Sequence, residues 1–364
     1  MTKTFLCYLF FLFPPLGVFF LTRKHKQEEE SMHCTQSVCI SRQNLIWWQT
    51  GEIQQQNSAV LRAWMVFTRL FRSLVAFDLV KIVSRQQSRF VMDRPYQLQP
   101  IKLGCEVTGI KLSEDVPEDV ISMIKDDVTK HRLLVFKNQE HLTPEQHLAV
   151  GRWFGEIEST FYNHPKSPHR DIFRVSNDRN EGCTNVGRTG WHIDGSFQEA
   201  PFSHSIYYII NVPNISATVF APLTDIVENL APEKRDLWNR LWMVSDRRSG
   251  PKHPLIYKHP ESGKPVMCFH LGMTEGFILD LDKKERKFLT EEETEEILKG
   301  IHHEFVKNDG AIQYKHKYEQ GDFIVSDNLA VGHEATPDTQ LPREKIGLRV
   351  MHRVTIAGKT SPKK

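Results

Sequence analysis

Short apolar runs bounded by turn-forming residues dominate the sequence after about residue 155. Four of them span residues 205–212, 218–221, 323–326 and 348–354, with Pro, Gly, Asn and Asp at their borders. Runs of this length between turn residues are typical of β-strands. The pattern predicts a mainly β fold, an antiparallel barrel or sandwich.

Helices are predicted around these strands. Residues 117–130 repeat apolar side chains at helical spacing, and the short run 133–136 that follows is a predicted buried strand. Thr143 is followed by Pro at the next position and Gln three positions on, which predicts a capping box and a helix to about residue 154. A second such helix start is Thr290, inside a charged stretch. We therefore predict one β-rich domain over residues 95–364 with helices packed outside it.

The first 94 residues form a basic leader. They carry 12 Lys/Arg and 6 Asp/Glu, against 35 and 39 in the rest of the chain. Residues 4–21 are almost wholly apolar, which leaves open a membrane anchor, a signal peptide or a spurious or uncut leader. Residues 59–90 alternate basic with large apolar side chains, as in a membrane-surface helix, a mitochondrial presequence or an ordinary docked helix. Localisation is thus open between a membrane-anchored body facing the cytoplasm and mitochondria.

The overall composition limits the partners of the chain. Its formal charge of only +2 gives no sign of a nucleic-acid partner. The six cysteines include no C-x-x-C pair and no zinc-finger spacing, which fits a reducing compartment. Membrane contact is expected only through residues 4–21 or 59–90, and the sequence leaves a homo-oligomer open.

Two His-x-Asp triplets occur, and only one has a context that indicates chemistry. His169-Arg-Asp171 matches the start of a kinase catalytic loop, but Ser176 stands where that loop has Asn, and no other kinase motif accompanies it. We interpret it as a surface histidine beside an ion pair. The second triplet, His192-Ile-Asp194, precedes a predicted strand.

The spacing of the second triplet is suited to a metal. In an extended segment, residues i and i+2 face the same side, so His192 and Asp194 can bind one cation together. A third ligand must come from a distant strand, and His333 is the best candidate. Two histidines and one carboxylate form the facial triad of non-heme iron oxygenases, which leaves coordination positions open. The alternative is a pair of hydrogen-bonded barrel residues.

Several segments in order resemble the taurine dioxygenase / 2,4-dichlorophenoxyacetate dioxygenase family, whose members use Fe(II) and 2-oxoglutarate. The resemblance covers about residues 95–359. It implies a jelly-roll double-stranded β-helix and dependence on Fe(II), 2-oxoglutarate and O2. The segments that carry it are LGCEVTGIKL (103–112), HRLLVFKNQ (131–139), WHIDGSF (191–197), NVP (211–213) with ATVF (217–220), GD…DN…H (321–333) and RVMHR (349–353).

The resemblance also implies roles for single residues. His192, Asp194 and His333 match the iron ligands. Arg349 and Thr218 match the residues that hold the distal carboxylate of 2-oxoglutarate, and a planar guanidinium suits a carboxylate because it forms two parallel hydrogen bonds.

Three further positions match substrate-facing residues of the family. Arg353 matches an arginine that faces the acidic group of the substrate in several members, the alternative being a structural ion pair. Phe197 matches a pocket-lining position, although a core phenylalanine fits as well. His164 falls where the family varies its substrate contacts.

The implied reaction oxidises, usually by hydroxylation, an aliphatic C–H of a small acidic organic molecule, with release of succinate and CO2. The sequence does not separate hydroxylation from desaturation or ring closure. One alternative is a catalytically inactive jelly-roll binding protein of the same fold. Another is a zinc hydrolase with the same ligands, against which Arg349 and Thr218 argue.

Overall fold

The computed structural model describes most of the chain beyond the leader. The predictions for residues 4–21 and 59–90 lie outside the described residues. Among the described residues, no helix is both long and apolar enough to cross a bilayer. The described residues are 94–364 without 160–162, 188–189, 214–216 and 247–249.

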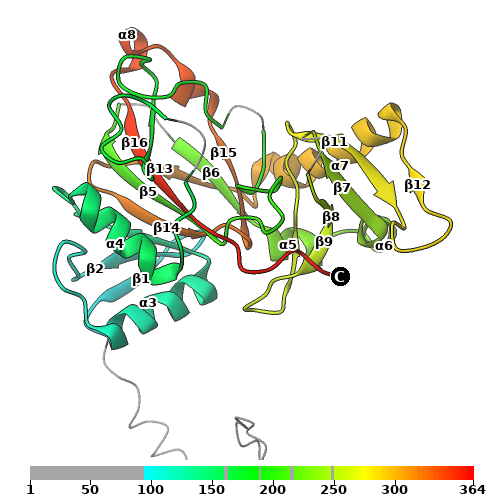
Figure 1. The fold of residues 1–364 in the computed structure, drawn as a ribbon, viewed down its shortest axis with the longest axis horizontal. Helices are drawn as coiled ribbons and strands as arrows, with labels where there is room; N and C mark the ends of the chain where they lie inside the picture. Colours follow the sequence, from blue (N-terminus) through cyan, green and yellow to red (C-terminus); the bar gives the residue numbers. More distant parts are fainter. Residues whose placement is uncertain (1–93, 160–162, 188–189, 214–216, 247–249) are drawn as a thin grey trace, which may run out of the picture. The chain divides into compact units, whose positions relative to one another are not determined.

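Strands outnumber helices in this part of the chain (Figure 1). The strands are β1 (Gln97–Pro100), β2 (Cys105–Thr108), β3 (Leu133–Phe136), β4 (Phe173–Ser176), β5 (His204–Asn211), β6 (Ala217–Pro222), β7 (Leu241–Ser245), β8 (Lys252–Pro254), β9 (Ile256–Lys258), β10 (Pro265–Met267), β11 (Thr274–Leu279), β12 (Lys287–Phe288), β13 (Tyr314–Lys317), β14 (Phe323–Asp327), β15 (Val331–Ala335) and β16 (Val350–Ile356). The helices are α3 (Glu118–His131), α4 (Pro144–Phe154), α5 (Leu223–Glu228), α6 (Pro232–Arg240), α7 (Glu291–Gly310), α8 (Arg343–Ile346) and the 3-10 helix η1 (Pro337–Gln340).

Two sheets of the jelly roll face each other. The larger has the strand order β1-β2-β3-β14-β5-β16-β4, antiparallel except for the β2–β3 pair, and the smaller has the order β13-β6-β15. A hydrophobic core joins them, with Tyr207 and Ile209 from β5, Phe220 from β6 and Val331 from β15. This confirms the predicted mainly β, jelly-roll fold with flanking helices.

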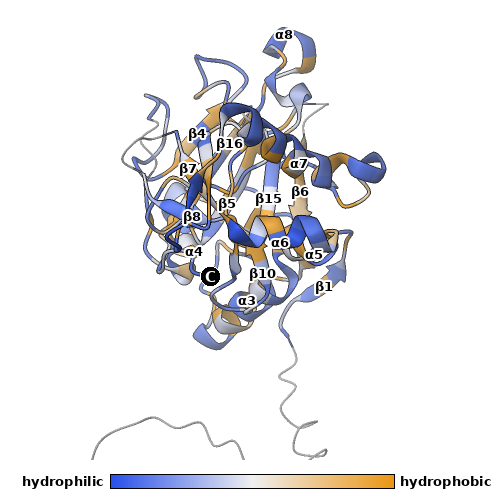
Figure 2. Ribbon diagram, turned by 90° about the vertical axis from the view of Figure 1, so that its right-hand side faces the viewer, coloured by the Kyte–Doolittle hydropathy of each residue, from blue (hydrophilic) through white to orange (hydrophobic). Residues whose placement is uncertain are grey.

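Strand β3 shows why the central strands read as unbroken apolar runs. Leu133 and Val135 belong to the core between the sheets, whereas Leu134 and Phe136 belong to a second core that includes residues of α3 and α4. Side chains alternate along a strand, so a sheet covered on both faces needs apolar residues at every position. Figure 2 shows hydrophobic residues mainly along the strands and hydrophilic ones in the outer loops and helix ends.

The predicted helix starts are confirmed. Both Thr143 and Thr290 accept a hydrogen bond from the backbone N–H three residues on, and each threonine N–H donates in return to the side chain of that residue. Helices α3 and α4 pack on the outer face of the large sheet (Figure 1). Strand β16 begins two residues later than predicted, because the Arg349 N–H donates to Asn177 Oδ1 at 2.8 Å instead of to a neighbouring strand.

Residues 223–310 form a part that the sequence did not predict in detail. A four-stranded sheet, β12-β11-β7-β8, and the pair β9–β10 join α5, α6 and α7 there. Its strands have two to six residues, too short to show a clear alternation. Trp238, Phe277 and Ile301 are buried at its centre, in a core that also contains Trp191, next to the first histidine of the predicted triad.

Acid sensitivity of the fold follows from His147 on α4. This ring packs against the rings of Tyr208 and Phe323, and its burial lowers its pKa to about 3. In the unfolded chain, His147 takes up a proton near pH 6.5, whereas in the folded chain it stays neutral until a much lower pH. The contribution of His147 to the free energy of unfolding therefore falls as the pH drops below about 6.5. Between pH 7.5 and 5, the free energy of unfolding should therefore fall by about 2 kcal/mol less in His147→Phe than in wild type. Urea unfolding at both pH values measures this, and an unchanged pH dependence in the variant would contradict it.

Candidate active site

His192 and His333 lie side by side because their backbones pair. The His192 N–H donates to the His333 carbonyl at 3.1 Å, and the His333 N–H donates back at 3.0 Å. His192 pairs in turn with His270, so residues 191–193 extend the small sheet beyond β15. The rings of His192 and His333 lie 4.4 Å apart, centre to centre, and the ring of His270 stacks on His192 at 4.6 Å.

The hydrogen bond of His192 determines which nitrogen is free. Its Nδ1 lies 2.7 Å from the Gly190 carbonyl, which can only accept, so Nδ1 carries the proton. The lone pair is then on Nε2, which lies 3.9 Å from Asp194 Oδ1. Burial lowers the pKa of His192, and it lowers that of His333 to about 3. Both imidazoles are therefore neutral at neutral pH, the form that binds metals.

Asp194 is held on both of its oxygens. Ser205 Oγ donates to Oδ2 at 2.6 Å, and Arg353 Nη1 donates to Oδ1 at 2.8 Å. Burial opposes ionisation of this carboxyl, but the guanidinium of Arg353 holds its pKa below the usual range. Asp194 is thus a buried carboxylate with a fixed orientation.

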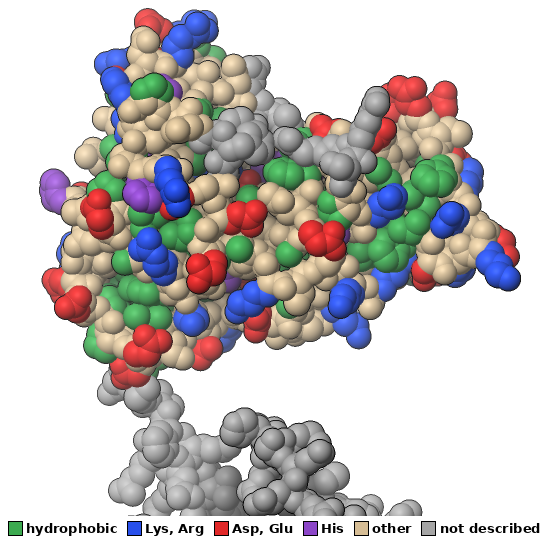
Figure 3. Space-filling model, viewed as in Figure 1, with side chains coloured by type: hydrophobic (Ala, Val, Ile, Leu, Met, Phe, Trp, Pro, Cys, Tyr) green, Lys and Arg blue, Asp and Glu red, His purple; other side chains and the backbone are tan. Residues whose placement is uncertain are grey.

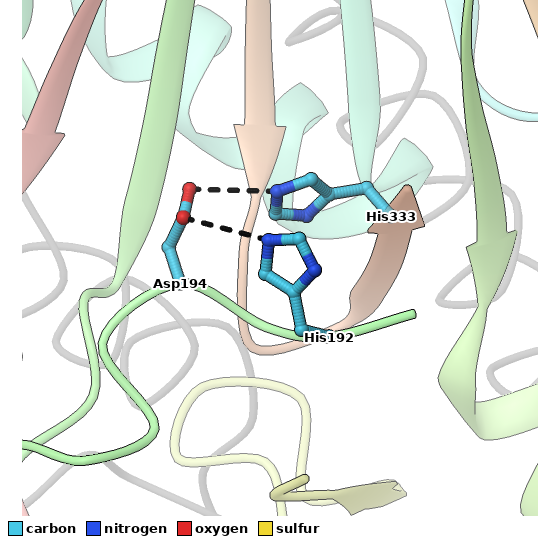
Figure 4. Close-up of side chains that lie close together, drawn as sticks. All are labelled: His192, Asp194 and His333. Carbon is cyan, nitrogen blue, oxygen red and sulfur yellow. Dashed lines mark ion pairs between the residues drawn. The ribbon is translucent and has the colours of Figure 1, made fainter. Parts of the chain in front are cut away.

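The three side chains fit a divalent cation. Figure 4 shows Asp194 with one oxygen toward each imidazole, and His333 Nε2 lies 3.5 Å from Asp194 Oδ2. Each residue offers one ligand atom within 4.8 Å of the others, and all three residues are buried. Two neutral imidazoles and one carboxylate on one side of a cation form the donor set of a facial triad. The structure therefore brings together the three residues predicted as ligands.

The two residues predicted for 2-oxoglutarate also meet. Arg349, Thr218 and the three triad residues line one cavity of about 220 Å³. The Tyr318 hydroxyl donates to Thr218 Oγ1 at 2.5 Å, and the Arg349 guanidinium lies 6.0 Å from the centre of the Tyr318 ring. Burial lowers the pKa of Arg349.

The predicted substrate residues divide into two groups. Arg353 and Phe197 line the same cavity. Arg353 also lies over the Phe173 ring at 5.0 Å, and its buried Nε has no hydrogen-bond partner among the described residues. His164, by contrast, is absent from the described lining of the cavity. Its ring nitrogens contact the Lys166 N–H and the Arg179 carbonyl, so the geometry gives its predicted role no support.

Several residues around the site are not predicted by the sequence. These residues contact the predicted ones from other segments of the chain, and the sequence predicts no role for any of them, although Asn328 lies within the quoted segment 321–333. They are Ser205, which donates to Asp194, Tyr318, which donates to Thr218, His270, which stacks on His192, and Asn328, which hydrogen-bonds the backbone of Asp194. The one signal in the sequence for such a residue is a polar side chain at an inward-facing position of an apolar strand, as with Ser205 in β5. The other His-x-Asp triplet agrees with its interpretation as a surface histidine beside an acidic residue, because His169 is partly exposed and its Nδ1 lies 3.6 Å from Asp171 Oδ2.

Comparison with known proteins gives consistent matches. Residues 94–355 match the model of the taurine catabolism dioxygenase TauD, TfdA family. A relative from Saccharomyces cerevisiae, described as an alpha-ketoglutarate-dependent sulfonate dioxygenase, is 24% identical over 277 residues. That match spans 68% of this chain and 64% of the relative, just under two thirds of its length. A Pseudomonas putida relative, described as an alpha-ketoglutarate-dependent sulfate ester dioxygenase, is 23% identical over 71% of this chain and 87% of its own.

A solved structure agrees on the fold. It is described as a putative alpha-ketoglutarate-dependent taurine dioxygenase from Burkholderia xenovorans, with a TM-score of 0.60 and 22% sequence identity. The likeness covers 72% of this chain and 93% of that one. Alpha-ketoglutarate is another name for 2-oxoglutarate. The family match extends over most of the chain, so this protein belongs to the TauD, TfdA family of Fe(II)- and 2-oxoglutarate-dependent dioxygenases.

Proposed function

We propose that this chain oxidises an aliphatic C–H bond of a small organic anion, by hydroxylation, with consumption of 2-oxoglutarate and O2 and release of succinate and CO2. One observation carries the proposal. His192, Asp194 and His333, which can hold a cation, share a single cavity with two buried arginines, Arg349 and Arg353. Two cationic side chains beside one metal site suit two anions, the cosubstrate and the substrate.

The first role is metal binding. His192 and His333 would each give Nε2 to Fe(II), and Asp194 would give one carboxylate oxygen. The other oxygen would keep its hydrogen bond to Ser205 or Arg353, because each donor contacts a different oxygen. When bound, Fe(II) supplies the redox chemistry that couples decarboxylation of 2-oxoglutarate to oxidation of the substrate. The protein supplies ligands that hydrogen bonds to Gly190, Ser205 and Arg353 already orient.

The second role is binding of 2-oxoglutarate. Arg349 would hold its distal carboxylate through two parallel hydrogen bonds. Thr218 would donate a third, because its oxygen already accepts from Tyr318 and its own hydrogen is left to point elsewhere. Burial strengthens these contacts, since Arg349 and Thr218 are 4% and 6% exposed.

The third role is recognition of the substrate. Arg353 has an unsatisfied buried Nε, and an acidic group of the substrate would supply its acceptor. Phe197, Phe202 and Met273 line the same cavity and would pack on the carbon skeleton and exclude water. The names of the yeast and Pseudomonas relatives, with sulfonate and sulfate ester substrates, support an anionic substrate for this chain as well.

Local arginines are needed because the surface does not attract anions. Residues 95–364 carry slightly more acidic than basic side chains. Figure 3 shows both signs interspersed over the face in view, with hydrophobic side chains between them. An anion is therefore selected inside the cavity and not by the overall field.

Metal and cosubstrate binding test the proposal first. We expect anaerobic calorimetry of the full chain to show binding of Fe(II), then of 2-oxoglutarate, and succinate formation on admission of O2 with a substrate. His192→Ala should abolish metal binding and turnover, because one of three ligands is lost. His164→Ala is the matched control, a histidine outside the cavity, and should bind both as wild type does.

Two results would sink the proposal. Wild-type protein that binds neither Fe(II) nor 2-oxoglutarate would rule out the reaction class. Binding of both without succinate formation, across sulfonates, sulfate esters and carboxylates, would favour the inactive binding protein.

A second experiment separates the two arginines. Arg349→Gln removes charge-assisted hydrogen bonds worth about 1.5–3 kcal/mol and should weaken 2-oxoglutarate binding by roughly 10- to 100-fold. Arg353→Gln should raise the KM for the organic substrate by a similar factor and leave the dissociation constant of 2-oxoglutarate within about threefold of wild type. Because Arg353 contacts Asp194, Fe(II) affinity is measured in parallel. Equal losses for both ligands in both variants would contradict the assigned roles.

A further inference from the structure

The side chain of Asn328 is bound entirely to backbone near the site. It lies in the turn between β14 and β15 and is 1% exposed. Its Oδ1 accepts from the Asp194 N–H at 2.8 Å. Its Nδ2 donates to the Asp194 carbonyl at 2.9 Å and to the Phe202 carbonyl at 2.6 Å. Asp194 therefore has both of its backbone groups bonded to one amide, as a strand neighbour would bond them.

The chain needs such a support at this position because it leaves the sheet there. His192 and Ile193 pair with strand-like neighbours, but Gly195 has φ +73° and lies in a turn. A Cβ at Gly195 would lie 2.8 Å from the Phe202 ring, so the turn is tightly closed. Asp194 is thus the first residue of the turn, and Asn328 takes the place of the missing strand.

The turn that contains Asn328 leads directly into the strand that carries His333. Asn328 precedes β15, which carries His333, and its own N–H donates to the Ser203 carbonyl at 3.0 Å. The preceding residue, Asp327, accepts from the Leu329 N–H and pairs with the buried His259 at 3.1 Å. The segment that holds the backbone of Asp194 is therefore itself fixed, and it is continuous with the strand of His333.

We propose that Asn328 is a positioning residue that sets the Asp194 carboxylate against the two imidazoles before the metal binds. This rests on the proposed role of Asp194 as a metal ligand. Ser205 and Arg353 orient the carboxylate itself, and Asn328 fixes the backbone from which it projects. Residues that orient metal ligands commonly contribute about 10- to 100-fold to metal affinity.

A purely structural amide of the same kind exists elsewhere in the domain. Gln139 is also 1% exposed. Its Oε1 accepts from the Leu112 N–H at 2.8 Å, and its Nε2 donates to the Ile110 and Lys137 carbonyls at 2.9 and 2.8 Å. None of these partners lines the cavity. Gln139→Ala therefore removes the same number and type of hydrogen bonds without touching the site.

The experiment measures Fe(II) dissociation constants of the full chain by anaerobic calorimetry, well below the melting temperatures. The variants are Asn328→Ala, Asn328→Asp and Gln139→Ala. We expect both alanine variants to lose similar thermal stability. Of these two alanine variants, only Asn328→Ala should weaken Fe(II) binding, by tenfold or more.

Asn328→Asp keeps the volume and the acceptor for the Asp194 N–H but loses both donors. Its added negative charge alone would tighten cation binding, whereas loss of the positioning contact would weaken it. We expect it to weaken Fe(II) binding by tenfold or more. The proposal would be overturned if either folded Asn328 variant bound Fe(II) as tightly as wild type or more tightly. It would also be overturned if Gln139→Ala lost as much Fe(II) affinity as Asn328→Ala. If wild type binds no Fe(II), the proposed function fails together with it, whereas unchanged variants of a binding wild type overturn this inference alone.

Discussion

The reciprocal backbone hydrogen bonds between His192 and His333 set the geometry on which the rest of the site depends. They bring two residues 141 positions apart in the sequence into direct register, so that both rings project from adjacent strands toward one cavity. Asp194 follows two residues after His192, on the same face, and completes the group. The jelly roll is needed for this pairing because it places β15, near the end of the chain, beside a segment that precedes β5.

Hydrogen bonding and charge pairing explain how the buried carboxylate of Asp194 is accommodated. A buried carboxylate is costly unless it is hydrogen-bonded and paired, and Asp194 has Ser205 on one oxygen and Arg353 on the other. The imidazoles stay neutral because burial disfavours their protonation. The site is therefore close to charge balance with Arg353, and it has room for one cation and for anions beside it. The same ion pair would couple the proposed substrate arginine to the proposed metal ligands, since Arg353 contacts Asp194 and lines the cavity.

Local signals in the sequence predicted local structure well. The capping boxes at Thr143 and Thr290 involve residues three apart, so they could be read directly, and the apolar runs of β3, β5 and β14 marked strands covered on both faces. The ordered motifs predict the site residues, and the structure brings seven of the eight positions predicted for metal, cosubstrate and substrate into one cavity. They are His192, Asp194, Phe197, Thr218, His333, Arg349 and Arg353.

Contacts between distant residues could not be predicted. The sequence around Asn328 does not show that this residue contacts Asp194, and the sequence around Tyr318 does not show a contact with Thr218. The register between separate segments is a property of the folded sheets. The sequence predicts a substrate contact for His164 only from its position in a variable segment, and in the structure its ring contacts the backbone of Lys166 and Arg179. The short strands of residues 223–310 had too few positions for a periodic pattern.

A crystal structure of the protein with Mn(II) and 2-oxoglutarate, prepared without O2, tests the central claim most directly. The account predicts one metal ion bound by Nε2 of His192, Nε2 of His333 and a carboxylate oxygen of Asp194, with the distal carboxylate of 2-oxoglutarate on Arg349 and Thr218. A metal bound through other residues, or 2-oxoglutarate with its distal carboxylate on Arg353 instead of Arg349, would contradict it.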